Sequence, residues 1–156
     1  MLIGAVLAFA PISELRGAIP FLLARGGNPI SVYLFSVCIN ALISPFVFFF
    51  LNTLHRLLVH VPVYTRLFNA LVERARGKLE EKVEKYEYWG VSIFVAIPLP
   101  VTGAWTGTLG AWILGLDPRR TFLHVIFGVC VAGIIVLLVS YFGIEAFSFF
   151  TKSISY

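Results

Sequence analysis

Three long stretches of this chain contain no aspartate, glutamate, lysine or arginine, and they limit the folds open to it. They cover residues 26–55, 88–116 and 121–144 of the 156. A helix of about 20 residues crosses a hydrocarbon core of about 30 Å, so each stretch is long enough to span a membrane. The whole chain is 59% hydrophobic and only 13% charged, which is too little charge for the surface of a soluble domain. We therefore expect an all-α integral membrane protein in the cell membrane.

The first 24 residues do not have the pattern of one spanning helix. Residues 1–10 are apolar but end at Pro11, which leaves about 15 Å of helix, half of a bilayer. Residues 17–24 then resume the apolar pattern. We predict a re-entrant hairpin, in which two half-length helices meet at a tip near the middle of the membrane. A secretory signal peptide is a poor alternative, because Glu14 and Arg16 lie where a cleavage region should be small and neutral.

Two further segments follow the first hairpin. Asn28-Pro29 opens a spanning helix that extends to about residue 54, and Pro45 is expected to kink it because proline lacks a backbone donor. Residues 55–89 mix charges of both signs with leucines at helical spacing, which predicts an amphipathic helix on the membrane surface. A solvated linker helix is the alternative reading of residues 55–89.

The second half of the chain repeats the first. Residues 90–116 are apolar but broken by the stretch PLPVTGAWTG, and Asp117-Pro118 opens a second spanning helix, to about residue 143. Pro11-x-Ser13 and Asn28-Pro29 match Pro100-x-Thr102 and Asp117-Pro118 at one constant offset of 89 residues. The order of elements repeats as well. We predict a single membrane domain with repeat 1 at 1–54, repeat 2 at 90–143 and a short interfacial tail at 144–156.

The charge distribution predicts the orientation. A re-entrant hairpin adds no net crossing and the helix after it adds one, so the second repeat is inverted relative to the first. One face then carries nine of the basic residues, and by the positive-inside rule it is cytoplasmic, with both termini outside. These nine are Arg56, Arg66, Arg74, Arg76, Lys78, Lys82, Lys85, Arg119 and Arg120.

The two hairpin tips are the predicted binding site. Non-helical backbone at membrane depth has to be buried in protein or line a wet cavity, so both tips should face one polar centre. The second half-helix of each hairpin is expected to start near Gly17 or Gly103, where its free N–H groups favour anions. Arg16 offers a bidentate fork for phosphate, and Glu14 is the predicted proton carrier. The predicted substrate-binding residues are Ser13, Glu14, Arg16, Gly17, Thr102, Gly103, Trp105, Thr106 and Gly107.

A purely structural reading of these residues stays open. Glu14 and Arg16 can pair with each other and lock the hairpin, and Trp105 can serve apolar packing. The sequence contains no nucleophile–base set, no metal-ligand spacing and no phosphate-binding loop of the P-loop type, so we expect neither an enzyme nor a metal or cofactor. The two cysteines, Cys38 and Cys130, are expected to be packing residues.

At the two tips, PISELRGAIP and PLPVTGAWTG, the chain resembles the small multidrug export family, which is related to the DedA/VTT membrane proteins. The order of segments extends this resemblance over nearly the whole chain. The family name implies drug export, whereas the DedA/VTT relatives imply movement of lipids, including polyprenyl-phosphate carriers, with proton coupling. The second tip here lacks the arginines that DedA proteins carry in their second hairpin.

Three functions therefore remain. The preferred one is a transporter or flippase for an anionic lipid phosphate, with Arg16 as headgroup clamp and Glu14 as proton-linked acid. The second is an exporter of cationic drugs, in which Glu14 alone holds the cation. The third is a structural membrane protein that transports nothing. Membrane lipids are the expected surroundings, a homo-oligomer is expected to cover the wide apolar flanks, and no nucleic-acid partner is expected.

Overall fold

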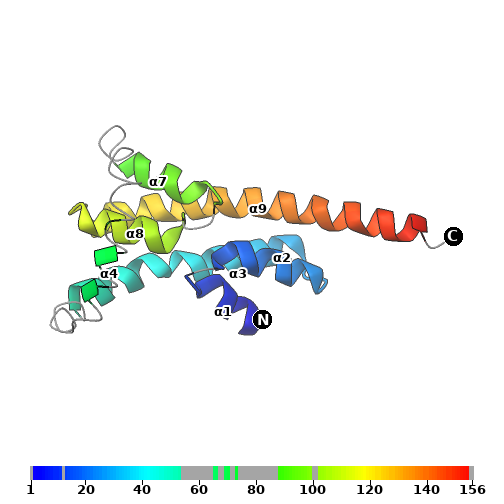
Figure 1. The fold of residues 1–156 in the computed structure, drawn as a ribbon, viewed down its shortest axis with the longest axis horizontal. Coiled ribbons are helices and arrows are strands. Elements are labelled where there is room, and N and C mark those ends of the chain that lie inside the picture. Colours follow the sequence, from blue (N-terminus) through cyan, green and yellow to red (C-terminus); the bar gives the residue numbers. More distant parts are fainter. Residues whose placement is uncertain are drawn as a thin grey trace.

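The computed structural model describes residues 2–11, 13–53, 65–66, 69–70, 73, 88–99 and 102–154, and residues 144–154 by their backbone alone. These residues form helices and connecting turns, with no strand in the part of the chain described. The expected amphipathic helix at 55–89 lies almost entirely outside these residues. The helices are labelled in Figure 1.

The first half of the chain folds into four helices. Helices α1 (Leu2–Phe9) and α2 (Glu14–Ala24) are separated at the Pro11 region, so residues 1–24 form two short helices, as expected. However, α2 begins three residues before the predicted start at Gly17. Helix α3 (Pro29–Ala41) is followed by α4 (Ile43–Thr53), and the break at Leu42 lies just before Pro45. Proline cannot donate to the preceding turn, which explains why the helix is interrupted there.

The second half contains three helices among the residues described. Helices α7 (Tyr88–Ala96) and α8 (Ala104–Ile113) are joined by a non-helical segment that contains Thr102 and Gly103. Helix α9 (Pro118–Ile154) has 37 residues and includes most of the predicted tail. The prediction of a separate tail at 144–156 is thus wrong for residues 144–154. No proline occurs after Pro118, and Gly143 does not take up the positive φ that ends many helices.

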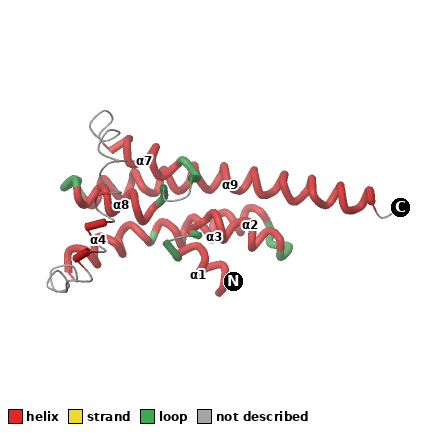
Figure 2. The backbone as a smooth tube through the Cα atoms, in the orientation of Figure 1, coloured by secondary structure: helices red, strands yellow, loops and turns green. Residues whose placement is uncertain are grey.

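The long helix α9 organises the bundle. Figures 1 and 2 show α2 and α3 beside its middle part, α7 and α8 beside its first part, and its last turns extending beyond the other helices. Helix α4 packs on α8 as well as on α9. Elements from the two halves of the chain therefore share one core rather than forming two separate units.

The turns after α2 and α8 have the same geometry. Gly26 and Gly115, which are 89 residues apart, both have positive φ, of 79° and 70°. The next amide in each turn donates to a carbonyl five residues earlier, from Gly27 to Leu22 at 3.1 Å and from Leu116 to Ala111 at 3.0 Å. Such bonds close a helix end with a glycine in the left-handed region. The offset of 89 residues seen in the sequence thus recurs in the backbone.

The starts of α3 and α9 also correspond. The Asn28 side chain accepts from the amides of Ile30 and Ser31 at 3.1 and 3.3 Å. In the second half, Asp117 Oδ1 accepts from the Arg120 amide at 2.9 Å. Both side chains satisfy amide groups that have no partner in the first helical turn, and both are followed by proline. Local chemistry alone therefore sets these two helix starts, as the sequence predicts.

Two stretches of the described chain are long and apolar enough to cross a membrane. They are Pro29–Thr53, with 25 residues, and Pro118–Gly143, with 26 residues. Large apolar side chains also cover the outside of the molecule, where a soluble protein would carry charge. Among the most exposed are Ile30, Phe49, Leu123 and Val139, each at least 65% exposed. This surface suits a lipid environment.

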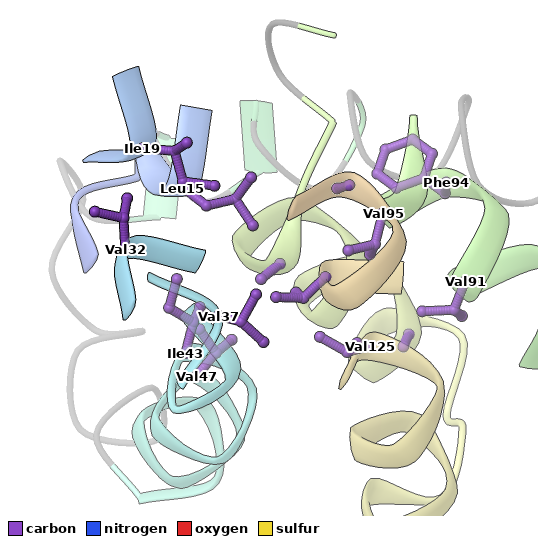
Figure 3. Close-up of a cluster of buried hydrophobic side chains, with 14 of the residues drawn as sticks. Leu15, Ile19, Val32, Val37, Ile43, Val47, Val91, Phe94, Val95 and Val125 are labelled. Atoms are coloured by element: carbon purple, nitrogen blue, oxygen red, sulfur yellow. The ribbon is translucent and has the colours of Figure 1, made fainter. Parts of the chain in front are cut away.

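The buried core joins both halves. Figure 3 shows Leu15, Ile19, Val37 and Val47 from the first half and Val91, Val95 and Val125 from the second around one interior. Close helix approach depends on glycine at two points of α9. A Cβ on Gly128 would lie 2.7 Å from the Ser92 carbonyl oxygen, and one on Gly133 would lie 2.9 Å from the Tyr33 ring. Both contacts would force α9 away from its neighbours.

The two turn glycines give a direct test of the backbone. Neither Gly26 nor Gly115 has atoms within 4 Å of an added Cβ, so alanine there meets no neighbour and only the positive φ opposes it. We expect Gly26→Ala and Gly115→Ala each to lower the free energy of unfolding by about 1–2 kcal/mol. Gly143→Ala is the matched control, because Gly143 is equally open but has no positive φ. Thermal unfolding in detergent measures all three, and equal midpoints would contradict the assignment of these turns.

Candidate functional site

Glu14 lies inside the bundle at the break between α1 and α2. Its side chain is only 5% exposed, and it is the first residue of α2. Its φ of 46° makes it the one non-glycine residue with positive φ in the part of the chain described. An L-residue in this region is strained, and such strain persists where the surroundings hold the residue in place. The surroundings of the Glu14 carboxylate supply that hold.

The carboxylate of Glu14 sits at the N-terminus of α8. Its Oε1 accepts from the Trp105 amide at 3.3 Å, and the space beside Gly103 is filled by the carboxylate, since a Cβ there would come within 2.6 Å of Oε1. Gly103 itself has no side chain with which to cap α8. An acid from the first hairpin therefore takes the capping position of the second, where the helix dipole favours negative charge.

Arg16 binds the backbone that leads into α8. Its Nη1 donates to the Leu99 carbonyl, and its Nη2 donates to the Thr102 carbonyl and, at 3.3 Å, to the Thr102 hydroxyl. Its Nε is buried and has no partner in the described structure. There is no ion pair between Arg16 and Glu14. The structural alternative raised by the sequence, a direct pair of these two residues, is thus replaced by two contacts that join the first hairpin to the second.

Thr102 folds the segment that Arg16 binds. Its hydroxyl donates to the Ile97 carbonyl at 2.7 Å and accepts from the Leu99 amide at 3.2 Å. A threonine hydroxyl that bonds to nearby backbone stabilises a tight turn. The turn holds the Leu99 and Thr102 carbonyls where one guanidinium fork can reach both.

The carbonyl end of α1 is capped by three side chains. Ser13 Oγ donates to the Leu7 carbonyl at 2.6 Å, Asn40 Nδ2 to the Ala8 carbonyl at 2.8 Å, and Trp105 Nε1 to the Phe9 carbonyl at 2.8 Å. The last carbonyls of a helix have no partner within the helix, and leaving them bare in a buried place is costly. These caps come from three different elements, so they fix the position of α1 against α3 and α8.

Trp105 also packs by its ring. It meets the rings of Phe9 and Phe46 edge to face, with centroids 5.6 and 5.9 Å apart. Such edge-to-face pairs are favoured by the ring quadrupoles. The packing role that the sequence left open for Trp105 and its role as a donor are therefore both present, and the apolar ring cluster lies directly beside the Glu14 carboxylate.

Equivalent positions of the two halves meet at this centre. Arg16 and Trp105 are 89 residues apart, and each donates to backbone carbonyls at or just after the end of the other hairpin's first helix. Glu14 and Gly103 are also 89 residues apart, and they touch. The centre is therefore symmetric in its backbone but asymmetric in its chemistry, because a carboxylate stands on one side and a bare glycine on the other.

The structure brings together six of the nine residues predicted for the site. Ser13, Glu14, Arg16, Thr102, Gly103 and Trp105 all take part in the contacts between the tips. Gly17 and Gly107 lie within helices, where their amides donate to Ser13 and Gly103 at 3.0 and 2.8 Å and offer nothing to a ligand. Thr106 Oγ1 donates to the Gly103 carbonyl at 3.4 Å. The early start of α2 at Glu14 explains why Gly17 is not at the tip.

Asn40 is the site residue that the sequence reading missed. It is fully buried on α3 and caps α1 through its side-chain amide. The available signal was an asparagine in the middle of a predicted spanning helix, since polar side chains at membrane depth are costly and mark functional places. In the described part of the chain, no cluster of three or more His, Cys, Asp or Glu side chains could hold a metal ion.

Comparison with known families decides the kinship of the chain. The model of the family described as "Putative small multi-drug export protein" matches residues 14–135, which begins at Glu14 and extends into α9. The chain belongs to this family. Neither the curated proteins nor the solved structures include a match. The family is one of export proteins, and with the two long apolar helical stretches it indicates a membrane-associated transport protein rather than an enzyme.

The contact between Glu14 and Gly103 gives a second prediction. Gly103 has extended backbone that any residue can adopt, so alanine is opposed only by the collision of its Cβ with the carboxylate. We expect Gly103→Ala to lower the free energy of unfolding by about 1–3 kcal/mol, the usual cost of overpacking. In a Glu14→Ala background the same change should cost much less. A double-mutant cycle by thermal unfolding measures this coupling, and additive effects would refute the contact.

Proposed function

We propose that this protein is a membrane exporter of small organic cations that exchanges them for protons at Glu14. The observation that carries the proposal is a single buried carboxylate at the point where the two hairpins meet. Ionisable groups inside a membrane are costly and mark transport pathways. A carboxylate can be neutralised either by a proton or by a cationic substrate, so the two compete for one place.

The contacts of Arg16 favour a cation over an anion as substrate. Both terminal nitrogens of Arg16 already donate to the carbonyls of Leu99 and Thr102, and the N-terminus of α8 already holds the Glu14 carboxylate. An anion could bind here only after displacing Glu14 from α8. The rings of Trp105, Phe9 and Phe46 lie beside the carboxylate, and aromatic faces attract organic cations.

An anionic lipid phosphate is the second candidate substrate. One observation favours it: the guanidinium of Arg16 and the N-terminus of α8 converge on the same place, and both are suited to phosphate once Glu14 is protonated and moves away. This candidate also agrees with the resemblance to the DedA/VTT proteins, whose wider relationship implies lipid movement.

The proposed transport cycle uses the two hairpins as moving parts. In this proposal both hairpins are re-entrant, the second repeat is inverted, and the termini lie outside with residues 55–89 in the cytoplasm. Inverted halves with broken helices open a central site to one side and then the other. The contacts of Glu14 with α8 and of Arg16 with the Thr102 turn would break and re-form in each cycle. A homo-oligomer would cover part of the exposed apolar surface.

Loss of the carboxylate tests this function. Glutamine at position 14 keeps the size of the side chain and an acceptor for the Trp105 amide, so Glu14→Gln should fold normally. Its binding of ethidium should weaken roughly tenfold to a hundredfold, because a hydrogen bond or contact to a charged group is worth about 1.5–3 kcal/mol. Proteoliposomes with an imposed pH gradient measure ethidium export. A fully active Glu14→Gln protein would end the proposal, and export of polyprenyl phosphate without ethidium export would favour the second candidate.

Arg16 should matter for folding more than for cation binding. Lysine keeps the charge but cannot reach two carbonyls with one planar fork, so Arg16→Lys should lower the free energy of unfolding by about 1–2 kcal/mol. Arg25→Lys on the exposed end of α2 is the control, since Arg25 only lies over the Phe21 ring at 4.5 Å. Thermal unfolding compares the two. If Arg16→Lys is as stable as Arg25→Lys but loses transport, then Arg16 acts on the substrate directly, as the second candidate requires.

A further inference from the structure

Five buried polar side chains of the bundle have no hydrogen-bond partner for an atom that needs one. Each of the five residues is fully buried, with 0% of its surface exposed. The unpartnered atoms are four hydroxyl oxygens and one amide oxygen, and the statement covers the described part of the chain. The residues are Ser36, Asn40, Ser44, Thr108 and Thr121, and we call them the polar strip.

The orientation of the Asn40 amide is fixed by its one bond. The Ala8 carbonyl can only accept, so the Asn40 nitrogen must face it at 2.8 Å and the Asn40 oxygen must point elsewhere. That oxygen is buried and lacks a donor. Ser92 is a useful contrast, because its equally buried hydroxyl bonds to the carbonyl and to the ring nitrogen of His124, both at 3.0 Å. The unpartnered state is thus a property of the strip and not of buried hydroxyls in general.

Helix geometry orders the first three members of the strip. Ser36, Asn40 and Ser44 follow one another at intervals of four residues, which places them on one face of α3 and its continuation. The break at Leu42 keeps a right-handed helical φ and ψ, so the face is continued into α4. Asn40 lies level with the hairpin tip, since it caps α1. Ser36 and Ser44 then lie about 6 Å to either side along the axis.

The two threonines extend the strip in one direction. Helices α4 and α8 run side by side and are joined by the bond from Trp112 Nε1 to Asn52 Oδ1 at 2.9 Å. Counted back from this bond, Ser44 is level with the start of α8 and Thr108 lies one turn further on. Thr121 is in the first turns of α9, beyond the tight turn at Gly115, and about 12 Å from the level of the tip. The strip therefore runs along the bundle past the level of Glu14.

We propose that the polar strip holds a file of water molecules that carries protons to and from Glu14. Buried polar groups in folded proteins are bonded to protein or to ordered water, and these five have no protein partner in the described structure. The inference rests on the proposed role of Glu14, because a carboxylate that is 5% exposed needs a route for its proton. Each water accepts one proton and passes on another, and the carboxylate oxygen of Glu14 takes up or releases the last one. The chain carries only protons, with no oxidation or reduction.

Hydration of the strip can be measured without any transport. Solid-state NMR on the full chain in liposomes follows magnetisation transfer from water to methyl groups. The methyl signals of Thr108 and Thr121 should build up early. Ile19 is the matched control, because it is equally buried, carries no polar atom and stands 89 residues before Thr108. Build-up at both threonines as slow as at Ile19 would show a dry strip and overturn the inference.

Variants test the proton role. Ser44→Ala with Thr108→Val removes two hydroxyls at nearly constant volume. Because these hydroxyls have no protein partner, the free energy of unfolding should stay the same or rise, while proton flux in proteoliposomes falls several-fold and ethidium affinity is unchanged. Ser92→Ala is the control, and it should lose stability but keep the proton flux of the folded protein. Proton flux at the wild-type rate in the double variant would overturn the inference. Transport that survives Glu14→Gln would instead overturn the proposed function, and the NMR measurement separates the two failures.

Discussion

The interior of this bundle depends on how its buried helix ends are satisfied. The C-terminal end of α1 and the N-terminal end of α8 meet away from the surface, and each carries backbone groups that no helix can pair by itself. Side chains from the opposite half of the chain supply the partners: Trp105 donates to the end of α1, and Glu14 accepts from the start of α8. Because each hairpin caps the other, neither can keep this geometry alone.

The same arrangement explains why charge and proline occur together in the first tip. Pro11 helps to end α1 before the tip, and Glu14 takes up a strained φ of 46° that aims its carboxylate at α8. Arg16 follows two residues later and reaches the Thr102 turn. The chain thus gains a cross-brace between its halves in the place where a transporter has to change shape. A brace made of a few exchangeable hydrogen bonds can open and close, whereas a packed apolar core cannot.

The symmetry of the fold and the asymmetry of its chemistry have separate causes. The turns at Gly26 and Gly115 share one backbone geometry, since both halves must reverse direction after a helix of similar length. The side chains differ at the centre, because a carboxylate and a second carboxylate could not both occupy the space between Glu14 and Gly103. The polar strip is asymmetric in the same way: Asn40 in the first half corresponds to Val129 in the second.

The sequence by itself determined the helical class, the break at Pro11, the caps at Asn28 and Asp117, and the convergence of most site residues. These features follow from local rules, since proline, capping side chains and uncharged runs act within a few residues of themselves. Only the tertiary structure decided that Glu14 and Arg16 bind the other hairpin instead of each other, that Asn40 belongs to the site, and that α9 continues to Ile154. The partners of Glu14 and Asn40 lie 91 and 32 residues away, and no local pattern specifies which distant backbone group a buried side chain will meet.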